Sequence, residues 1–340
     1  MVGQTLRKVP APLYMFFVWT VVVTALTSGF TKQAIQNLLC YLIFVGAMTV
    51  VSLESSSETG PWLLRWLIRV AFLRALIEAF YLIAFGTISQ QDVGARAFGI
   101  TGLICLAVTV PLPNGGTAVH CLNYVLFAEI LLSGSRSATV IAALLLTFTS
   151  VRTARGVSAI GRALFKGSLA AFVVYYAVVH LPALHDRFFA GDKGGAAFGT
   201  TFNTSGRAVL WRVVYDDSKG HVLFGQGAGT SSALVRQVVQ SSGEPHNDYL
   251  RLFHDFGIVG VSLWMVGYLI LLHRIYQRAR SARNVERGLH FAAAIALIGI
   301  ALIAVTDNAL IYYFTMLPLA VLVGTSLSYP ARARAVTNHA

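Results

Sequence analysis

Charged residues are scarce in this chain, and acidic residues are the scarcest. Only 12% of the 340 residues are charged, and 14 Asp and Glu stand against 26 Lys and Arg. An average soluble domain carries about 25% charged residues. The hydrophobic fraction is 56% and the mean hydropathy is +0.67. This composition excludes an ordinary soluble domain and predicts a polytopic helical membrane protein.

Cysteine is also rare, since the chain contains only Cys40, Cys105 and Cys121. Each lies in or beside an apolar run, which predicts small core side chains and neither a disulfide framework nor a zinc site. The alternation of apolar and polar residues that barrel strands need is missing. We find no internal repeat and no low-complexity segment. The net charge of +12 does not indicate nucleic-acid binding, because the basic residues gather in short loops between apolar runs.

Apolar runs of spanning length recur along the chain, so we predict an all-α fold of about ten transmembrane helices. The predicted spans are residues 11–30, 34–52, 67–88, 97–112, 117–133, 137–151, 167–184, 257–272, 289–306 and 308–328. This divides the chain into an N-terminal bundle of about seven spans (1–184), a large loop with short amphipathic helices (185–256), and a C-terminal part of about three spans with a basic tail (257–340).

Basic residues predict the orientation. If ten spans are present, four segments rich in Lys and Arg lie on the same side of the membrane. The positive-inside rule predicts that this side is cytoplasmic and that both termini lie on it. The large loop then lies on the outer side. The basic residues of these segments are Arg7, Lys8, Arg152, Arg155, Arg162, Lys166, Arg274, Arg278, Arg280, Arg283, Arg287, Arg332 and Arg334.

The stretch from Glu244 to Gly260 packs ionisable and aromatic residues immediately before a long apolar run. Pro245, Asn247 and Asp248 predict a helix start, because short polar side chains accept hydrogen bonds from the first turn. The alternative for this stretch is a capped helix with ordinary interfacial residues. His246 and His254 are eight residues apart, a spacing that does not favour a metal site.

The candidates for chemistry on the predicted outer side are three arginines and one histidine: Arg136, Arg207, Arg212 and His246. Guanidinium groups bind phosphate oxygens with paired hydrogen bonds, and a histidine can exchange a proton with a sugar hydroxyl near neutral pH. Each has a simpler alternative. Arg136 would anchor a helix at the headgroups, Arg207 and Arg212 would solvate an amphipathic helix, and His246 would cap or hydrogen-bond at the surface.

Two further features allow other functions. Glu78, Glu129 and Asp307 lie within or beside spans, which favours a transporter or proton relay unless they pair internally. The Gly225–Thr230 segment predicts a flexible turn, because glycine permits positive φ. It does not indicate a dinucleotide site, because no strand-turn-helix unit surrounds it.

Several motifs in order resemble those of the O-antigen ligase and O-antigen polymerase superfamily of bacterial membrane glycosyltransferases. They are Ser133-Gly-Ser-Arg136, Arg207-x-x-Leu210-Trp211, Phe224-Gly-Gln-Gly-Ala-Gly-Thr230, Pro245-His-Asn-Asp-Tyr-Leu250 and Gly257-x-x-Gly260. The resemblance covers residues 130–275 best, and the segment before Arg136 is shorter than in the family.

The resemblance implies a GT-C-like helical fold with a large periplasmic loop in the bacterial inner membrane. It implies transfer of a glycan from an undecaprenyl-diphosphate carrier to an acceptor hydroxyl, without metal or other cofactor. Arg136 and Arg207 are similar to the family's diphosphate-binding arginines, and His246 is similar to its essential histidine. Arg212, Asn247, Tyr249 and Arg251, beside these positions, are expected to bind substrate. Expected partners are the lipid-linked donor, a glycan or lipid acceptor, membrane lipids and other polysaccharide-assembly proteins.

Two other functions remain possible at this point. A transporter or flippase of a lipid-linked or anionic solute would use the carboxylates within the bundle. A scaffold in envelope polysaccharide assembly would keep the motifs without activity.

Overall fold

The computed structural model describes residues 8–53, 59–85, 95–111, 116–153, 157–181, 185, 195–197, 200–202, 206–238, 243–282 and 284–329. This part is helical apart from one antiparallel pair of three-residue strands, β1 (Gly195–Ala197) and β2 (Thr200–Phe202). The helices are α2 (Ala11–Leu26), α3 (Lys32–Leu53), α4 (Thr59–Phe85), α5 (Ala95–Thr109), α6 (Gly116–Leu132), α7 (Arg136–Thr153), α8 (Val157–His180), α10 (Arg207–Ser218), α11 (Thr230–Val238), α12 (Asp248–Ser281), α13 (Asn284–Ile303), η1 (Ala309–Ile311) and α14 (Tyr313–Ser328).

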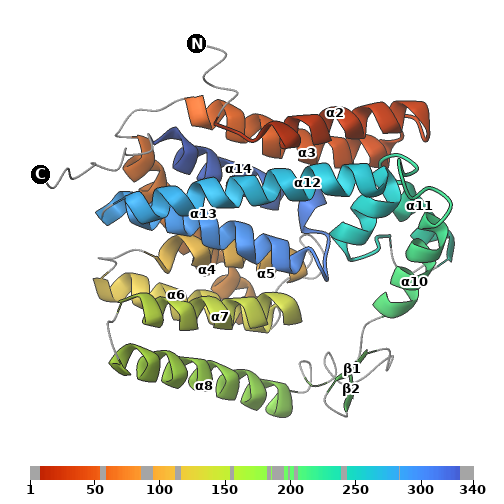
Figure 1. The fold of residues 1–340 in the computed structure, drawn as a ribbon. Coiled ribbons are helices and arrows are strands. Elements are labelled where there is room, and N and C mark those ends of the chain that lie inside the picture. Colours follow the sequence, from red (N-terminus) through yellow and green to blue (C-terminus); the bar gives the residue numbers. More distant parts are fainter. Residues whose placement is uncertain are drawn as a thin grey trace, which may run out of the picture.

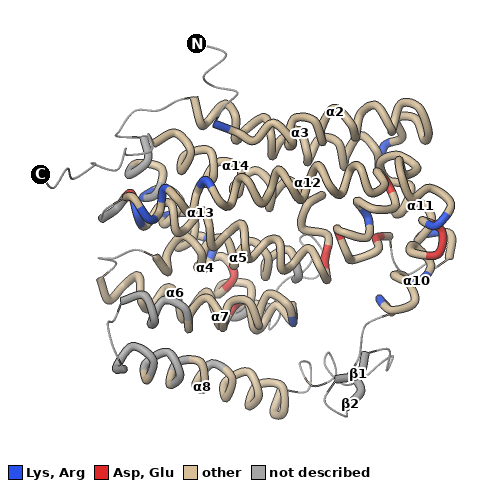
Figure 2. Tube along the Cα trace, viewed as in Figure 1, with Lys and Arg blue, Asp and Glu red and all other residues tan. Residues whose placement is uncertain are grey.

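Helices α2–α8 and α12–α14 lie side by side and form one elongated bundle (Figure 1). The chain passes back and forth, so its connections gather at the two ends of the bundle. One end carries α10, α11, the first turns of α12 and the start of α7, and we call it the loop end. The opposite end carries the end of α12 and the start of α13, and we call it the basic end because Lys and Arg gather there (Figure 2).

Three of these helices are long and apolar enough to cross a membrane: Lys32–Leu53, Asp248–Ser281 and Glu286–Ile303. Shorter apolar helices accompany them, at Ala11–Leu26, Ala97–Thr109, Gly116–Leu132, Arg136–Thr147, Gly167–His180 and Tyr313–Ser328. Large apolar side chains such as Leu26, Phe80 and Phe165 are exposed on the outside of the bundle. These features belong to a helical membrane protein, whose outer surface faces lipid rather than water.

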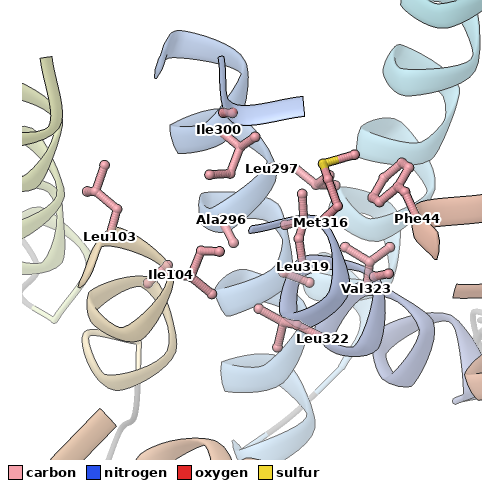
Figure 3. Packing of buried hydrophobic residues seen from close by; sticks show 14 of the residues in the cluster. Phe44, Leu103, Ile104, Ala296, Leu297, Ile300, Met316, Leu319, Leu322 and Val323 are labelled. Carbon is pink, nitrogen blue, oxygen red and sulfur yellow. The ribbon is translucent and has the colours of Figure 1, made fainter. Parts of the chain in front are cut away.

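The core lies between α3, α5, α13 and α14 (Figure 3). Leu103 and Ile104 of α5 approach α13, and α13 in turn packs against α14. Met316 and Leu319 of α14 are fully buried, as is Phe44 of α3. Because lipid is as apolar as these side chains, close packing rather than exclusion of water stabilises such contacts. The core therefore holds α13 and α14 together, and with them the loop that joins them at the loop end.

Several predicted boundaries were wrong. Helix α4 begins at Thr59 instead of residue 67, and α8 begins at Val157 instead of residue 167. Arg162 and Lys166, predicted in a loop, are therefore helical. Arg and Lys are good helix formers, so apolar run length underestimates a helix whose end is basic. Arg155 lies outside the described residues.

Helix α12 is longer than the predicted span 257–272 at both ends, since it begins at Asp248 and continues to Ser281. Arg274, Arg278 and Arg280, predicted in a loop, are therefore helical. The axis of α12 bends at Gly257, whose φ of 64° is not helical. A Cβ at this position would lie 2.2 Å from the Leu223 carbonyl oxygen, so only glycine fits. The kink separates a first segment at the loop end from a long apolar segment within the bundle, and it coincides with the predicted domain boundary at residues 256–257.

The buried carboxylates of the bundle pair internally. Glu78 is 1% exposed and forms an ion pair with Arg74, one turn earlier on α4. Glu129 of α6 lies 3.9 Å from the same guanidinium, which also donates to the Phe98 carbonyl oxygen at 2.5 Å. Arg74 thus ties α4, α5 and α6 together.

Candidate functional site

The first turn of α12 begins as the sequence predicts. The Asn247 side chain accepts a hydrogen bond from the Leu250 N–H at 3.0 Å and caps the helix. The Asp248 N–H donates to the Ala304 carbonyl oxygen at 2.8 Å, which fastens this turn to the loop after α13. On the other side, the Trp211 indole N–H donates to the Pro245 carbonyl oxygen at 2.9 Å. The residue between these anchors, His246, is therefore held by α10 and by the α13–α14 connection.

The backbone of His246 is unusual. Its φ is 53°, and it is the one non-glycine residue with positive φ in the described part of the chain. Side chains with a Cβ rarely adopt this conformation, and such positions cluster at functional sites. The conformation turns the imidazole toward the loop between α13 and η1. Its Nδ1 lies 2.9 Å from Asn308 Nδ2 and 3.6 Å from Asp307 Oδ1.

Asp307 lies beside His246 and is influenced electrostatically by Arg207. The Asp307 side chain is 2% exposed, whereas that of His246 is 20% exposed. Burial by itself would raise the pKa of Asp307, but the His246 imidazole and the positive charge of Arg207 outweigh it, so the pKa lies below its ordinary value. Arg207 is the first residue of α10. An imidazole and a buried carboxylate from two distant segments therefore meet at the loop end, and the positive charge of Arg207 acts electrostatically on that carboxylate.

A fully buried arginine lies behind this group. Arg251 donates to Asp248 Oδ1 at 2.6 Å, to Glu244 Oε2 at 2.9 Å and to Asn308 Oδ1 at 2.5 Å. Its side chain is 0% exposed. Glu244 is held in turn by the Ser232 hydroxyl at 2.6 Å and by the Gln33 amide at 3.1 Å. This network connects α3, α11, α12 and the α13–α14 loop.

The Gly225–Thr230 segment, predicted as a flexible turn, is fixed by hydrogen bonds to neighbouring elements. Asp255, which is fully buried, accepts the Gly229 and Ser231 N–H groups at 2.9 Å each and the Thr230 hydroxyl at 3.1 Å. The first N–H groups of α11 are thereby satisfied by a protein carboxylate. Gly227 has φ of 97°, and a Cβ there would lie 2.2 Å from the Ser28 hydroxyl. The segment is a structural clamp between α12 and the α2–α3 connection.

The other predicted site residues lie as follows. Arg136 is the first residue of α7, a helix that begins at the loop end (Figure 1). Arg212 has an 86% exposed side chain, 3.8 Å from Asp216. Tyr249 donates its hydroxyl to the Ala301 carbonyl oxygen at 2.9 Å. Arg207 begins α10, the helix whose Trp211 contacts Pro245 next to His246, whereas Arg251, Asn247 and Tyr249 are engaged in hydrogen bonds within the protein.

Sequence reasoning did not assign Asp307 and Asn308 to this site. Asp307 was considered only as a carboxylate within a transporter. Its position between the last two predicted spans puts it on the same side as the large loop, and that parity was a usable signal. Among the described residues, no group of three His, Cys, Asp or Glu side chains could hold a metal ion.

Comparison with known proteins agrees with the motifs. Residues 122–265 match the model of a protein family described as O-antigen ligase. The matched segment runs from α6 to the apolar part of α12 and includes Arg136, Arg207 and His246. No curated protein sequence matches the chain. The family match confirms the resemblance that the order of motifs indicates.

Proposed function

We propose that this chain, a member of the O-antigen ligase and polymerase superfamily, transfers a glycan from an undecaprenyl-diphosphate carrier to an acceptor hydroxyl at the outer face of the inner membrane. The acceptor would be a lipid A-core, a growing polysaccharide or another glycan. The observation that carries this proposal is the position of His246 beside the buried Asp307 at the loop end, next to α10, the helix that Arg207 begins.

Arg207 and Arg136 would bind the diphosphate. As the bond between the sugar and the diphosphate breaks, negative charge develops on the leaving group, and fixed guanidinium groups stabilise the transition state more than the ground state. Planar guanidinium groups match phosphate oxygens in pairs. Arg207 starts α10 at the loop end, where its charge acts on Asp307, and Arg136 starts a helix at the same end of the bundle.

His246 would contact the acceptor hydroxyl. Its chain neighbour Pro245 is held by Trp211, Asp248 two residues later is held by Ala304, and 20% of the His246 side chain is exposed. An imidazole in this position can exchange a hydrogen bond or a proton with a sugar oxygen. Substrate binding by Arg212, the most exposed of the predicted residues, is part of the same proposal.

The distribution of charge supports an orientation with about ten spans and the loop end in the periplasm. Lys and Arg gather at the basic end (Figure 2), where Arg274 donates to the Lys8 carbonyl oxygen at 2.9 Å and Arg278 to the Leu327 carbonyl oxygen at 2.9 Å. The positive-inside rule places this end, with both termini, in the cytoplasm. A lipid-linked donor in the outer leaflet would then meet Arg207 and His246.

Purified protein in liposomes with a lipid-linked oligosaccharide and a glycan acceptor tests the proposal against its alternatives. Glycan product means a transferase, movement of the donor between leaflets means a flippase, and neither means a scaffold. His246→Ala should lower the rate by about 10²-fold or more while membrane insertion is unchanged.

Arg207→Lys should lower it by about 10²-fold, because an ammonium cannot form two parallel hydrogen bonds. Arg280→Lys, an exposed change on the basic end of α12, is the matched control and should keep the wild-type rate. Full activity of Arg207→Lys would contradict the paired binding of the diphosphate.

A further inference from the structure

Asn308 bridges the buried arginine and the histidine. It is fully buried in the loop between α13 and η1. Its side-chain oxygen accepts from Arg251 Nη2 at 2.5 Å, and its side-chain nitrogen lies 2.9 Å from His246 Nδ1. The two ends of one amide therefore face two different groups, and the orientation of the amide determines what each group meets.

Arg251 decides this orientation. A guanidinium has only donors, so the atom of Asn308 that faces it has to be the oxygen. Arg251 cannot turn away, because Asp248 and Glu244 hold the same guanidinium at 2.6 Å and 2.9 Å. A flipped amide would place its NH₂ group against an Arg251 NH₂ group in a buried site, leaving donors without an acceptor.

With the amide fixed in this way, Asn308 presents an N–H donor to His246 Nδ1. The Nδ1 atom then has to accept, and a neutral imidazole that accepts at Nδ1 carries its hydrogen on Nε2. A charged group, Asp307, faces the ring from the loop after α13. Asp307 Oδ1 is 3.6 Å from Nδ1, too far for a hydrogen bond, so Asn308 is the Nδ1 partner at hydrogen-bond distance.

We propose that Arg251, acting through Asn308, holds His246 as the neutral Nε2–H tautomer, so that the imidazole donates a hydrogen bond to a substrate oxygen instead of removing the acceptor proton. Arg251 is then a positioning residue for His246. The sequence predicted that Arg251 binds substrate, and this inference replaces that prediction. This inference rests on the proposed function and refines the part that His246 plays in it.

The reaction balances without a protein base at Nε2. The bond between the anomeric carbon and the diphosphate oxygen breaks, and the bond between that carbon and the acceptor oxygen forms. The diphosphate leaves with the electron pair and gains one negative charge. The proton of the acceptor hydroxyl goes to a diphosphate oxygen. The His246 Nε2–H group donates a hydrogen bond to a substrate oxygen and so positions that oxygen.

Nitrogen-15 NMR of the histidine rings tests the tautomer directly. Full-length protein with ¹⁵N-labelled histidine is measured in detergent at neutral pH, and His246→Ala identifies the signals that belong to His246. We expect the shift of an unprotonated nitrogen at Nδ1 and of a protonated nitrogen at Nε2. A protonated Nδ1, alone or together with Nε2, overturns the inference.

Asn308→Asp tests the relay. The carboxylate still accepts from Arg251, but it offers His246 an acceptor in place of a donor. We expect Nδ1 to become protonated and the transfer rate to fall by about 10²-fold or more. An unchanged tautomer in a folded variant overturns the role of Asn308, and the wild-type spectrum decides the tautomer even if this variant does not fold.

His246→Gln separates donation from proton removal, because the glutamine amide can donate a hydrogen bond but cannot act as a base. We expect it to retain at least tenfold more activity than His246→Ala, and equal inactivity of the two contradicts the donor role. The inference and the proposed function fail separately. Transfer by a protein with an Nδ1–H tautomer disproves only the inference, whereas absence of transfer by wild-type protein disproves the function.

Discussion

Replacing Asp255 with alanine should destabilise the loop end of this protein more than any surface change. The fully buried carboxylate accepts hydrogen bonds from the N–H groups of Gly229 and Ser231, both at 2.9 Å, and from the Thr230 hydroxyl at 3.1 Å. Gly229 and Ser231 are themselves buried. Asp255→Ala leaves two buried N–H groups without an acceptor, at about 1–3 kcal/mol each, so we expect a loss of about 2–6 kcal/mol.

Thermal unfolding of the detergent-solubilised protein measures this loss, with Asp216→Ala as the control. Asp216 is 51% exposed and pairs with Lys219 at 2.7 Å, an exposed ion pair whose removal costs about 0–1 kcal/mol. Limited proteolysis locates the effect, because the Gly225–Thr230 segment should become sensitive only in Asp255→Ala. Equal melting temperatures for the two variants, with no new cleavage, would refute the clamp that Asp255 forms.

Two further predictions concern the kink and the buried carboxylate beside His246. Gly257→Ala should lower the melting temperature by several degrees, because a Cβ would lie 2.2 Å from the Leu223 carbonyl oxygen. Gly46→Ala is the control and should be neutral or stabilising, because a Cβ there would have its nearest neighbour at 3.9 Å, within α3. Equal effects of the two changes would contradict the constraint at the kink. The pKa of Asp307 is held below its ordinary value of 3.8, so its ionised form stabilises the folded protein above that pH and this contribution is lost as the pH falls through the lowered pKa. The difference in melting temperature between wild type and Asp307→Asn should therefore shrink as the pH falls below about 4, and a difference that grows below that pH would contradict the lowered pKa.

The relation between the motifs and the site differs from one motif to the next. His246 lies beside Asp307 at the loop end, where α10, which Arg207 begins, contacts the neighbouring Pro245 through Trp211. The glycine-rich motif has a structural role. Asp255 accepts hydrogen bonds from the N–H groups of Gly229 and Ser231, so these groups are not available to a phosphate. Arg251, which the sequence suggested as a ligand, supports the site from behind.

The sequence by itself determined the helical membrane class, the start of α12 and the concentration of basic residues at one end. These properties depend on neighbours along the chain. Run length and mean hydropathy predict apolar helices, and Asn247 caps the turn that follows it whatever the rest of the chain does. The order of motifs was sufficient to indicate the family.

Only the tertiary structure decided which polar groups meet. Asn308 is 62 residues from His246, and Gln33 is 211 residues from Glu244, yet each pair is within hydrogen-bond distance. Whether an arginine binds substrate or is buried in an internal ion pair depends on the carboxylates that other segments place beside it. No local sequence pattern contains that information. The packing of α13 and α14 places Asp307 and Asn308 beside His246, because the loop between two helices is positioned by the core on which they pack.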